Sequence, residues 1–256
     1  MREAVNRLST RALVIFSAGN SFGCVTFPAN LKSVLAVGAT DKFDVKWNYS
    51  PSFSNGDSMD LVASSGELAL KGDIWTMDIT GFSGYNPIVH CDSCPGIDPL
   101  PELTANQKYT SHFGGTSASA PQVSGVAALV MSYAKKSNVS NRINLTLDDY
   151  KKIIRFSTDD KGPVGWDPSY GQGRLNAMKA MVEVARGDVT KDGKVLLTDI
   201  VYLINYIYHG GPPPSPLLSL GDANCSGMVN QTDVVYLNNY VFKGGPPPVI
   251  HCYLFY

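Results

Sequence analysis

The stretch that decides the fold of this protein is FGGTSASAPQVSGVAALV, which runs from Phe113 to Val130. Two glycines and a series of small residues lead directly into an apolar segment, which we interpret as a helix from Ser117 to about Lys135. Pro121 is compatible with this helix because we place it in the first turn, where no backbone N–H is needed. The face that packs consists of Ala, Ser, Gly and Val, so the helix can approach a sheet very closely.

Ser117 stands at the joint between the turn and the helix. A serine hydroxyl is a weak nucleophile unless a base lies within hydrogen-bond reach and donors await the developing oxyanion. The free amides and dipole of a helix N-terminus favour negative charge there. Ser117 is therefore either a simple helix cap or a nucleophile, and its surroundings must decide between the two.

Composition excludes several classes of function. The 256 residues carry a net charge of −1 with 17% charged residues, which argues against nucleic acid or an anionic membrane as a partner. No run of about 20 apolar residues could span a membrane. Among the five cysteines, Cys91 and Cys94 form a CxxC pair with only His90 nearby, which favours a short disulfide loop or free thiols over zinc. Near the end of the chain, Cys252 is a candidate partner for Cys225.

The first part of the chain reads as alternating strands and helices. LVIFSAGN and SVLAVGATD are expected to be buried strands, and residues 66–109 read as a loop-rich surface insertion. A second helix should begin in LTLDDYKKIIRFSTD with Thr146 as its cap, and a third should follow the Gly-x-Gly turn of GQGRLNAMKAM. This pattern predicts an α/β fold.

These segments resemble the subtilisin-like serine proteases. GGTSASAP is similar to the family's nucleophile motif, SAGN to its oxyanion segment, and FPANLKSVLAVGATD, SPSFSNGDSMDLVASSG and YGQGRLNAMKAM to its later segments, in the family's order. The resemblance implies a three-layer α/β fold around a parallel sheet over residues 1–186, incomplete at its N-terminal side. It also implies a serine endopeptidase acting on proteins or peptides, with Ser117 as nucleophile and Asn20 as oxyanion donor.

The catalytic base is the main departure from this family, whose triad runs in the order Asp, His, Ser along the chain. Both missing residues belong upstream of Asn20, and the 19 residues before it contain no histidine. His112 would lie roughly 15 Å from Ser117 on an extended chain, beyond any hydrogen bond. We therefore expect this chain to be an inactive fragment of a longer protease. The alternative is a calcium-binding adaptor that carries a dead protease remnant.

The last part of the chain is a tandem repeat. TDIVYLINYIYHGGPPP, starting at Thr198, returns 34 residues later as TDVVYLNNYVFKGGPPP. Each repeat begins with an acidic twelve-residue loop, Asp188 to Asp199 or Asp222 to Asp233, which ends in the Thr-Asp of the quoted copy. The loop has oxygen-bearing groups at the positions of a calcium loop and Gly193 or Gly227 at the turn. The expected calcium ligands are Asp188, Thr190, Asp192, the Lys194 carbonyl and Asp199 in the first loop, and Asp222, Asn224, Ser226, the Met228 carbonyl, Asn230 and Asp233 in the second.

These loop–helix pairs resemble the type I dockerin module, which would occupy residues 187–250 and leave a tail at 251–256. The resemblance implies a small helical module that binds calcium and docks onto a cohesin-type scaffold or a surface protein outside the cell. Leu196 and Ser226 replace the usual polar and acidic residues, which predicts weaker calcium binding. The alternative is a pair of Asp/Gly-rich turns without metal. The apolar stripes of the two helices are expected to form a core between them.

Overall fold

The computed structural model describes residues 1–52, 59–66, 74–79, 109–110, 113–136, 145–250 and 252. The chain divides into two compact units: residues 1–9, 14–123 and 160–174 form the first, and residues 10–13, 124–159 and 175–256 form the second. The boundary that we predict at residue 186 separates sequence modules and stays a prediction. Most of the expected insertion at 66–109 lies outside the described residues.

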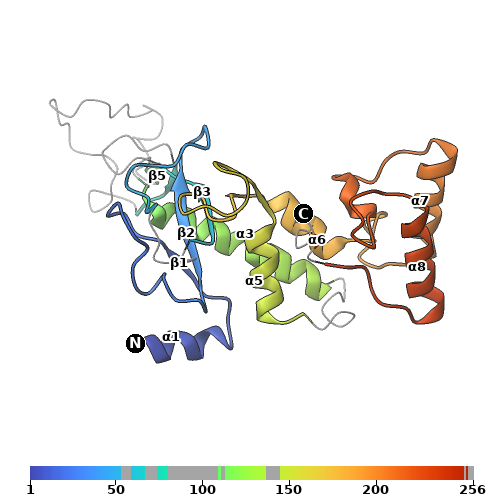
Figure 1. Cartoon of the computed structure of the whole chain (residues 1–256), viewed down its shortest axis with the longest axis horizontal. Helices are drawn as coiled ribbons and strands as arrows, with labels where there is room; N and C mark the ends of the chain where they lie inside the picture. The colour runs from blue at the N-terminus through green and yellow to red at the C-terminus, as the bar shows by residue number, and fades with distance from the viewer. Residues whose placement is uncertain are drawn as a thin grey trace. The chain divides into compact units, whose positions relative to one another are not determined.

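A parallel sheet forms the centre of the first unit. Strands β1 (Ile15–Ser17), β2 (Leu35–Thr40) and β3 (Leu61–Ser64) lie side by side, with Ile15 opposite Leu35 and Val37 opposite Leu61 (Figure 1). All six residues of β2 are buried, as expected for a parallel strand that is covered on both faces. The structure thus confirms both strands and the α/β class, but only β2 is buried throughout, whereas all three residues of β1 are partly exposed.

The Gly-x-Gly turn positions the next strand against β3. Strand β7 (Arg174–Leu175) pairs in parallel with β3 through Val62 and Arg174. Gly171 in the preceding turn has φ of 63°, and a Cβ atom there would lie 2.5 Å from the Asp60 carbonyl group. A glycine is required at this turn because no side chain fits so close to a neighbouring backbone. The unit also contains helix α1 (Arg2–Ser9) and the antiparallel pair β4 (Thr76–Met77) and β5 (Tyr109–Thr110).

Helix α3 (Thr116–Lys136) begins one residue earlier than the sequence indicates. Pro121 is consequently its sixth residue and lies beyond the first turn, so our placement of this proline was wrong. Since Pro121 has no N–H, the Ser117 carbonyl lacks the usual i+4 donor. Although α3 has 21 residues, neither it nor any other described helix is long and apolar enough to cross a membrane.

The second unit contains the two remaining helices that we expected before the repeat. Helix α5 (Leu147–Phe156) starts with a capping box in which Thr146 and Asp149 bind each other's backbone N–H groups. Strand β6 (Thr158–Asp159) follows it, and helix α6 (Ala177–Ala185) is capped by the Asn176 side chain. Ile153 and Ile154 of α5 and Ala180 of α6 are completely buried. Both predicted helices are thereby confirmed.

The repeat folds into two side-by-side helices, α7 (Leu197–His209) and α8 (Gln231–Lys243), with the short 3-10 helix η1 (Leu218–Gly221) before the second loop (Figure 1). Each helix ends at a left-handed glycine, Gly210 or Gly244. Leu203 and Leu237, which are equivalent in the repeat, are fully buried in the core between the helices. The predicted apolar stripes therefore do form this core.

Candidate functional site

Hydrogen bonds tie the start of α3 to the C-terminal end of β3. The Ser65 hydroxyl donates to the Gly115 carbonyl at 2.6 Å, and the Ser119 hydroxyl donates to the Ala63 carbonyl at 3.0 Å. Gly115 itself has φ of 74°, which lets the chain turn sharply from the loop into the helix. Ser119 is fully buried by these contacts while Ser117, two residues earlier, is exposed to solvent. The turn thus presents the Ser117 hydroxyl outward on a fixed backbone.

Asn20 follows β1 and contacts the residue directly before Ser117. Its Oδ1 atom accepts a hydrogen bond from the Thr116 backbone N–H at 2.9 Å and lies 2.9 Å from the Thr116 hydroxyl. The Gly19 N–H in turn donates to the Thr116 hydroxyl oxygen at 3.2 Å. Because Oδ1 is held in this way, the amide nitrogen occupies the opposite branch of the planar amide and remains the donor of the side chain.

Thr116 is a functional candidate that the sequence reasoning missed. Its side chain is completely buried, and it joins two segments that are 96 residues apart in the chain. A small polar residue immediately before a candidate nucleophile was the available signal, but it does not disclose the partner. Thr116 fixes Asn20 through the oxygen of the amide, which makes it a positioning residue for this site.

The described residues place a candidate nucleophile beside candidate oxyanion donors, but they show no base in contact with it. Backbone N–H groups at the start of α3 favour negative charge near Ser117. In the part of the chain that the structure describes, no basic side chain forms a hydrogen bond with the Ser117 hydroxyl. His209 on α7 is the one histidine among the described residues, while His90, His112 and His251 lie outside them.

The two acidic loops hold their first aspartates in the same way. Asp188 accepts hydrogen bonds from the N–H groups of loop positions five and six at 3.1 and 2.9 Å. Asp222 accepts from the same two positions at 2.9 and 3.0 Å. The position-six glycines, Gly193 and Gly227, have φ of 86° and 83°, as a turn of this kind requires. Both loops therefore wrap their own backbone around the first carboxylate.

The last aspartates of the loops are equally matched. Asp199 accepts from the N–H groups of positions three and nine at 3.0 and 2.8 Å, and Asp233 accepts from the same positions at 3.2 and 2.9 Å. The carboxylates at both ends of each loop are buried, with exposed fractions of 1% and 0% in the first loop and 4% and 0% in the second. Because the same hydrogen bonds recur in both loops, the loops share one defined conformation and are not irregular turns.

The other predicted ligand positions differ between the loops. In the second loop the Ser226 hydroxyl donates to the Met228 carbonyl at 3.1 Å, and the Asn230 side chain caps α8. Leu196 stands at the equivalent position of the first loop and contributes no side-chain oxygen. No three Cys, His, Asp or Glu side chains converge anywhere in the described ranges. A metal in either loop would therefore also need hydroxyl, amide and carbonyl oxygens, which suits Ca²⁺.

Electrostatics favour a cation in both loops. Burial raises the pKa of Asp188 and of Asp233 above the ordinary value of 3.8, and neighbouring carboxylates raise it further. Hydrogen bonds from the loop backbone oppose this rise in both cases. Buried carboxylates that lie close together are costly unless a positive charge is near. The pair of buried carboxylates at the ends of each loop therefore fits an oxygen-preferring divalent cation.

A disulfide connects the second loop to the end of the chain. Cys225 at loop position four is bonded to Cys252, which confirms this expected pairing. The Val249 N–H also donates to the Ala223 carbonyl at 3.0 Å, so the segment after α8 lies along the loop. The Cys91–Cys94 pair lies outside the described residues.

Known protein families match both the segment that contains Ser117 and the segment that contains the two acidic loops. The sequence profile of the subtilase family matches residues 1–173, and that of the dockerin type I domain matches residues 186–242. The calcium-dependent protease of Trichormus variabilis is 35% identical over 182 residues, which cover 68% of this chain and 24% of that protein. Bacillopeptidase F of Bacillus subtilis is 30% identical over 152 residues, which cover 58% of this chain and 9% of that protein.

The crystal structure of a lanthipeptide protease is similar in fold, with a TM-score of 0.54 and 26% identity over 70% of this chain and 54% of that one. The chain spans about a quarter or less of the length of the curated relatives named above. Dockerin type I domains bind calcium, so calcium is the cofactor that the matching module implies. Since the matching profile covers most of its residues, the chain belongs to the subtilase family, and it carries a dockerin type I domain behind the subtilase part.

Proposed function

We propose that this chain supplies the nucleophile and the oxyanion site of a serine endopeptidase. The observation that carries the proposal is the contact between Asn20 and Thr116, which brings a candidate oxyanion donor to the residue that precedes Ser117. A helix cap alone would not need a side chain from a distant strand to be fixed beside it. Membership of the subtilase family supports the same assignment.

In the proposed reaction, the Ser117 Oγ atom attacks the carbonyl carbon of a peptide bond and loses its proton to a base. The carbonyl oxygen becomes an oxyanion, which the Asn20 amide and the Ser117 N–H would stabilise. Collapse of this intermediate breaks the C–N bond while the protonated base gives its proton to the nitrogen, so the amine leaves and an acyl group stays on Ser117. Water then hydrolyses the ester. No base contacts Ser117 among the described residues. We propose that the chain alone is inactive and that a longer protein that contains it, here called the intact protein, supplies the base.

Labelling with a serine-directed fluorophosphonate tests this proposal. The intact protein should be labelled at Ser117, and the 256-residue chain alone should react slowly or not at all. Ser117→Ala should remove the label. Ser124 is an exposed serine about two turns further along α3, and Ser124→Ala should leave the label unchanged. Undiminished labelling of Ser117→Ala would refute the nucleophile. An intact protein that never reacts would support the alternative of a non-catalytic adaptor.

We further propose that the two loops bind calcium through the residues that the spacing indicates. The matched hydrogen bonds at Asp188 and Asp222, and at Asp199 and Asp233, support this assignment. Adding calcium to a chelated chain should increase its far-UV helical signal, because each loop runs into the first turn of a helix, α7 or α8. An identical spectrum with calcium and with chelator would count against it. The remaining proposed ligands are Thr190, Asp192, the Lys194 carbonyl, Asn224, Ser226, the Met228 carbonyl and Asn230.

The module is proposed to attach the protein to a cohesin-type scaffold or surface protein outside the cell. Its repeat leaves equivalent apolar residues exposed on both helices: Val201 and Tyr208 on α7, and Val235 and Phe242 on α8. Exposed apolar residues at matching positions suit docking onto a partner. Binding of the intact chain to immobilised cohesin domains, in calcium and in chelator, tests this role. Substitution of Tyr208 and Phe242 by Ser should weaken calcium-dependent binding.

A further inference from the structure

A side chain from α3 reaches the first calcium loop. The hydroxyl of Tyr133 donates a 2.8 Å hydrogen bond to Oδ2 of Asp188, the residue at loop position one. The same oxygen accepts the Gly193 N–H at 2.9 Å, while Oδ1 accepts a longer bond of 3.1 Å from Asp192. Asp188 is 1% exposed and Tyr133 is partly exposed, so the contact is partly buried. Tyr133 belongs to α3 and lies outside the repeated module.

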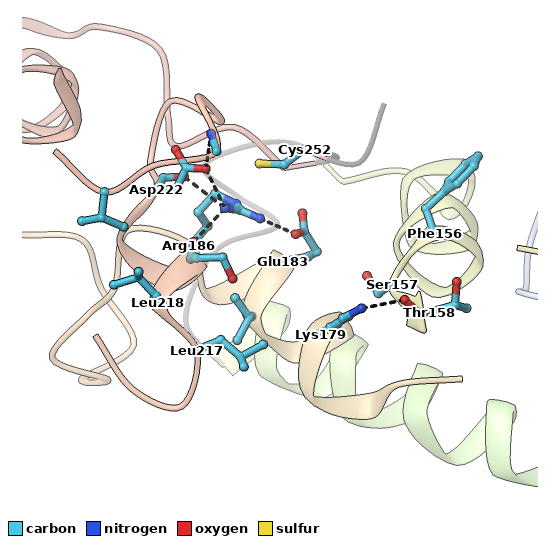
Figure 2. A pocket seen from close by; sticks show the side chains of 14 residues that line it. Phe156, Ser157, Thr158, Lys179, Glu183, Arg186, Leu217, Leu218, Asp222 and Cys252 are labelled. Atoms are coloured by element: carbon cyan, nitrogen blue, oxygen red, sulfur yellow. Dashed lines mark hydrogen bonds and ion pairs between the residues drawn. The ribbon is translucent and has the colours of Figure 1, made fainter. Parts of the chain in front are cut away.

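The second loop lacks a tyrosine at the equivalent place and has an arginine instead. The Arg186 guanidinium donates to the backbone carbonyls of Ser219 and Asp222 at 2.7 and 3.1 Å and lies 4.0 Å from Asp222 Oδ2. It is 4% exposed and also pairs with Glu183 of α6. Figure 2 shows the Arg186 side chain between Glu183 and Asp222. Each first-position aspartate therefore has one neighbour from outside the repeat, and the two neighbours differ in charge.

Packing keeps the first loop next to these helices. Val182 of α6 is 2% exposed within the core of the module, and Ala185 packs against the same core. The Gly187 N–H donates to the Leu220 carbonyl at 2.8 Å, which joins the residue before the first loop to η1. The loop that carries Asp188 is consequently fixed to α6 and η1 by packing and by a backbone hydrogen bond.

We propose that Tyr133 is a positioning residue of the first calcium loop and couples calcium binding there to the stability of the C-terminal half of α3. The inference rests on the proposed role of Asp188 as a ligand. A donor that holds Oδ2 fixes the orientation of the carboxylate, and outer partners of this kind typically change metal affinity by about 10–100-fold. Coupling is reciprocal, so calcium bound at Asp188 must also favour the helix conformation that presents Tyr133.

Calorimetric titration of the whole chain with Ca²⁺ tests the proposal. Tyr133→Phe should weaken one of the two calcium sites by about tenfold and leave the other unchanged. Tyr236→Phe is the matched control, because that hydroxyl donates to the Pro247 carbonyl at 2.9 Å and contacts neither loop aspartate. Asp188→Asn identifies the affected site, since it should remove binding in the same loop. Thermal unfolding in chelator checks that each variant is folded.

Hydrogen exchange of α3 provides the second measurement. Calcium should slow amide exchange in the last two to three turns of α3 in the wild-type chain, and Tyr133→Phe should reduce this protection. If Asp188→Asn removes a site while Tyr133→Phe binds calcium like the wild type, the coupling is wrong and the ligand assignment stands. If Asp188→Asn leaves both sites intact, the ligand assignment fails and the role of Tyr133 fails with it.

Discussion

The proposed nucleophile site and the two proposed calcium loops are held together by contacts over very different sequence separations. Asn20 and Thr116, which shape the surroundings of Ser117, are 96 residues apart and meet through a parallel sheet. In each calcium loop the carboxylates are held by N–H groups three to nine residues away. Each loop should therefore keep its internal hydrogen bonds as long as its own twelve residues are folded. The site at Ser117 depends instead on the packing of distant segments, so changes in one region should leave the other largely intact.

Ser117→Ala should have the largest effect in this comparison. Peptide hydrolysis by the intact protein should fall by about 10⁶-fold, which is the loss measured for the nucleophile in subtilisin itself, a member of the same family. Calcium titration of the variant should match the wild type, because the first carboxylate of each loop is held by N–H groups of its own loop. Steady-state kinetics and calorimetry on the same preparation measure both quantities. A large change in calcium affinity would show that the surroundings of Ser117 and the calcium loops are not independent.

Asn20→Ala should lower kcat by about 10²–10³-fold with a small change in KM, again the size found in subtilisin. Thr116→Val should cost less, about tenfold, because the Thr116 N–H still holds Asn20 after the hydroxyl is lost. Thr116→Ser keeps the hydroxyl and serves as the control. Equal kcat in wild type and Asn20→Ala would exclude Asn20 from the oxyanion site.

The two calcium loops should differ in affinity. The proposed ligands of the first loop include three carboxylates, Asp188, Asp192 and Asp199, while those of the second include two, Asp222 and Asp233. More ligand charge favours tighter binding, so we expect the first loop to be the tighter site. Asp188→Asn should lower the calcium affinity of the tighter site by at least about tenfold, and Asp222→Asn should lower that of the weaker site by a similar factor. Calorimetry with calcium resolves the two events. Loss of both sites in either single variant would show that the loops bind as one unit.

The smallest expected effect is the pH dependence of the stability of the chain when a chelator keeps it free of calcium. Burial raises the pKa of Asp188 and Asp233 above 3.8, so the protonated forms favour the folded state. Their contribution to stability is fully present below that ordinary value and is lost as the pH rises through the raised pKa. The melting temperature of the chelated chain should drop by a few degrees as these groups ionise.

Excess calcium should abolish that drop, because the metal stabilises the ionised carboxylates. Asp233→Asn should make the pH dependence in chelator shallower, and Asp148→Asn, an exposed carboxylate on α5, is the matched control. A chelated chain that becomes more stable over the same pH range would contradict the sign.

The sequence predicted the local features of this protein better than the distant ones. The capping box at Thr146, the turn glycines of both loops and the core around Leu203 and Leu237 depend on short spacings, and all are found in the structure. The contacts of Thr116 and Tyr133 could not be foreseen, because their partners lie 96 and 55 residues away. The role of Ser117 came from a resemblance over several segments, since a serine at a helix start is most often a cap.

Trapping an acyl-enzyme on the intact protein tests the central claim most directly. The protein would be mixed with an activated ester, quenched in acid and digested, and the acyl mass located by mass spectrometry. We predict one acylated peptide, which contains Ser117 and is absent from the Ser117→Ala variant. Acylation at another residue, or peptide hydrolysis that persists in Ser117→Ala, would contradict the account.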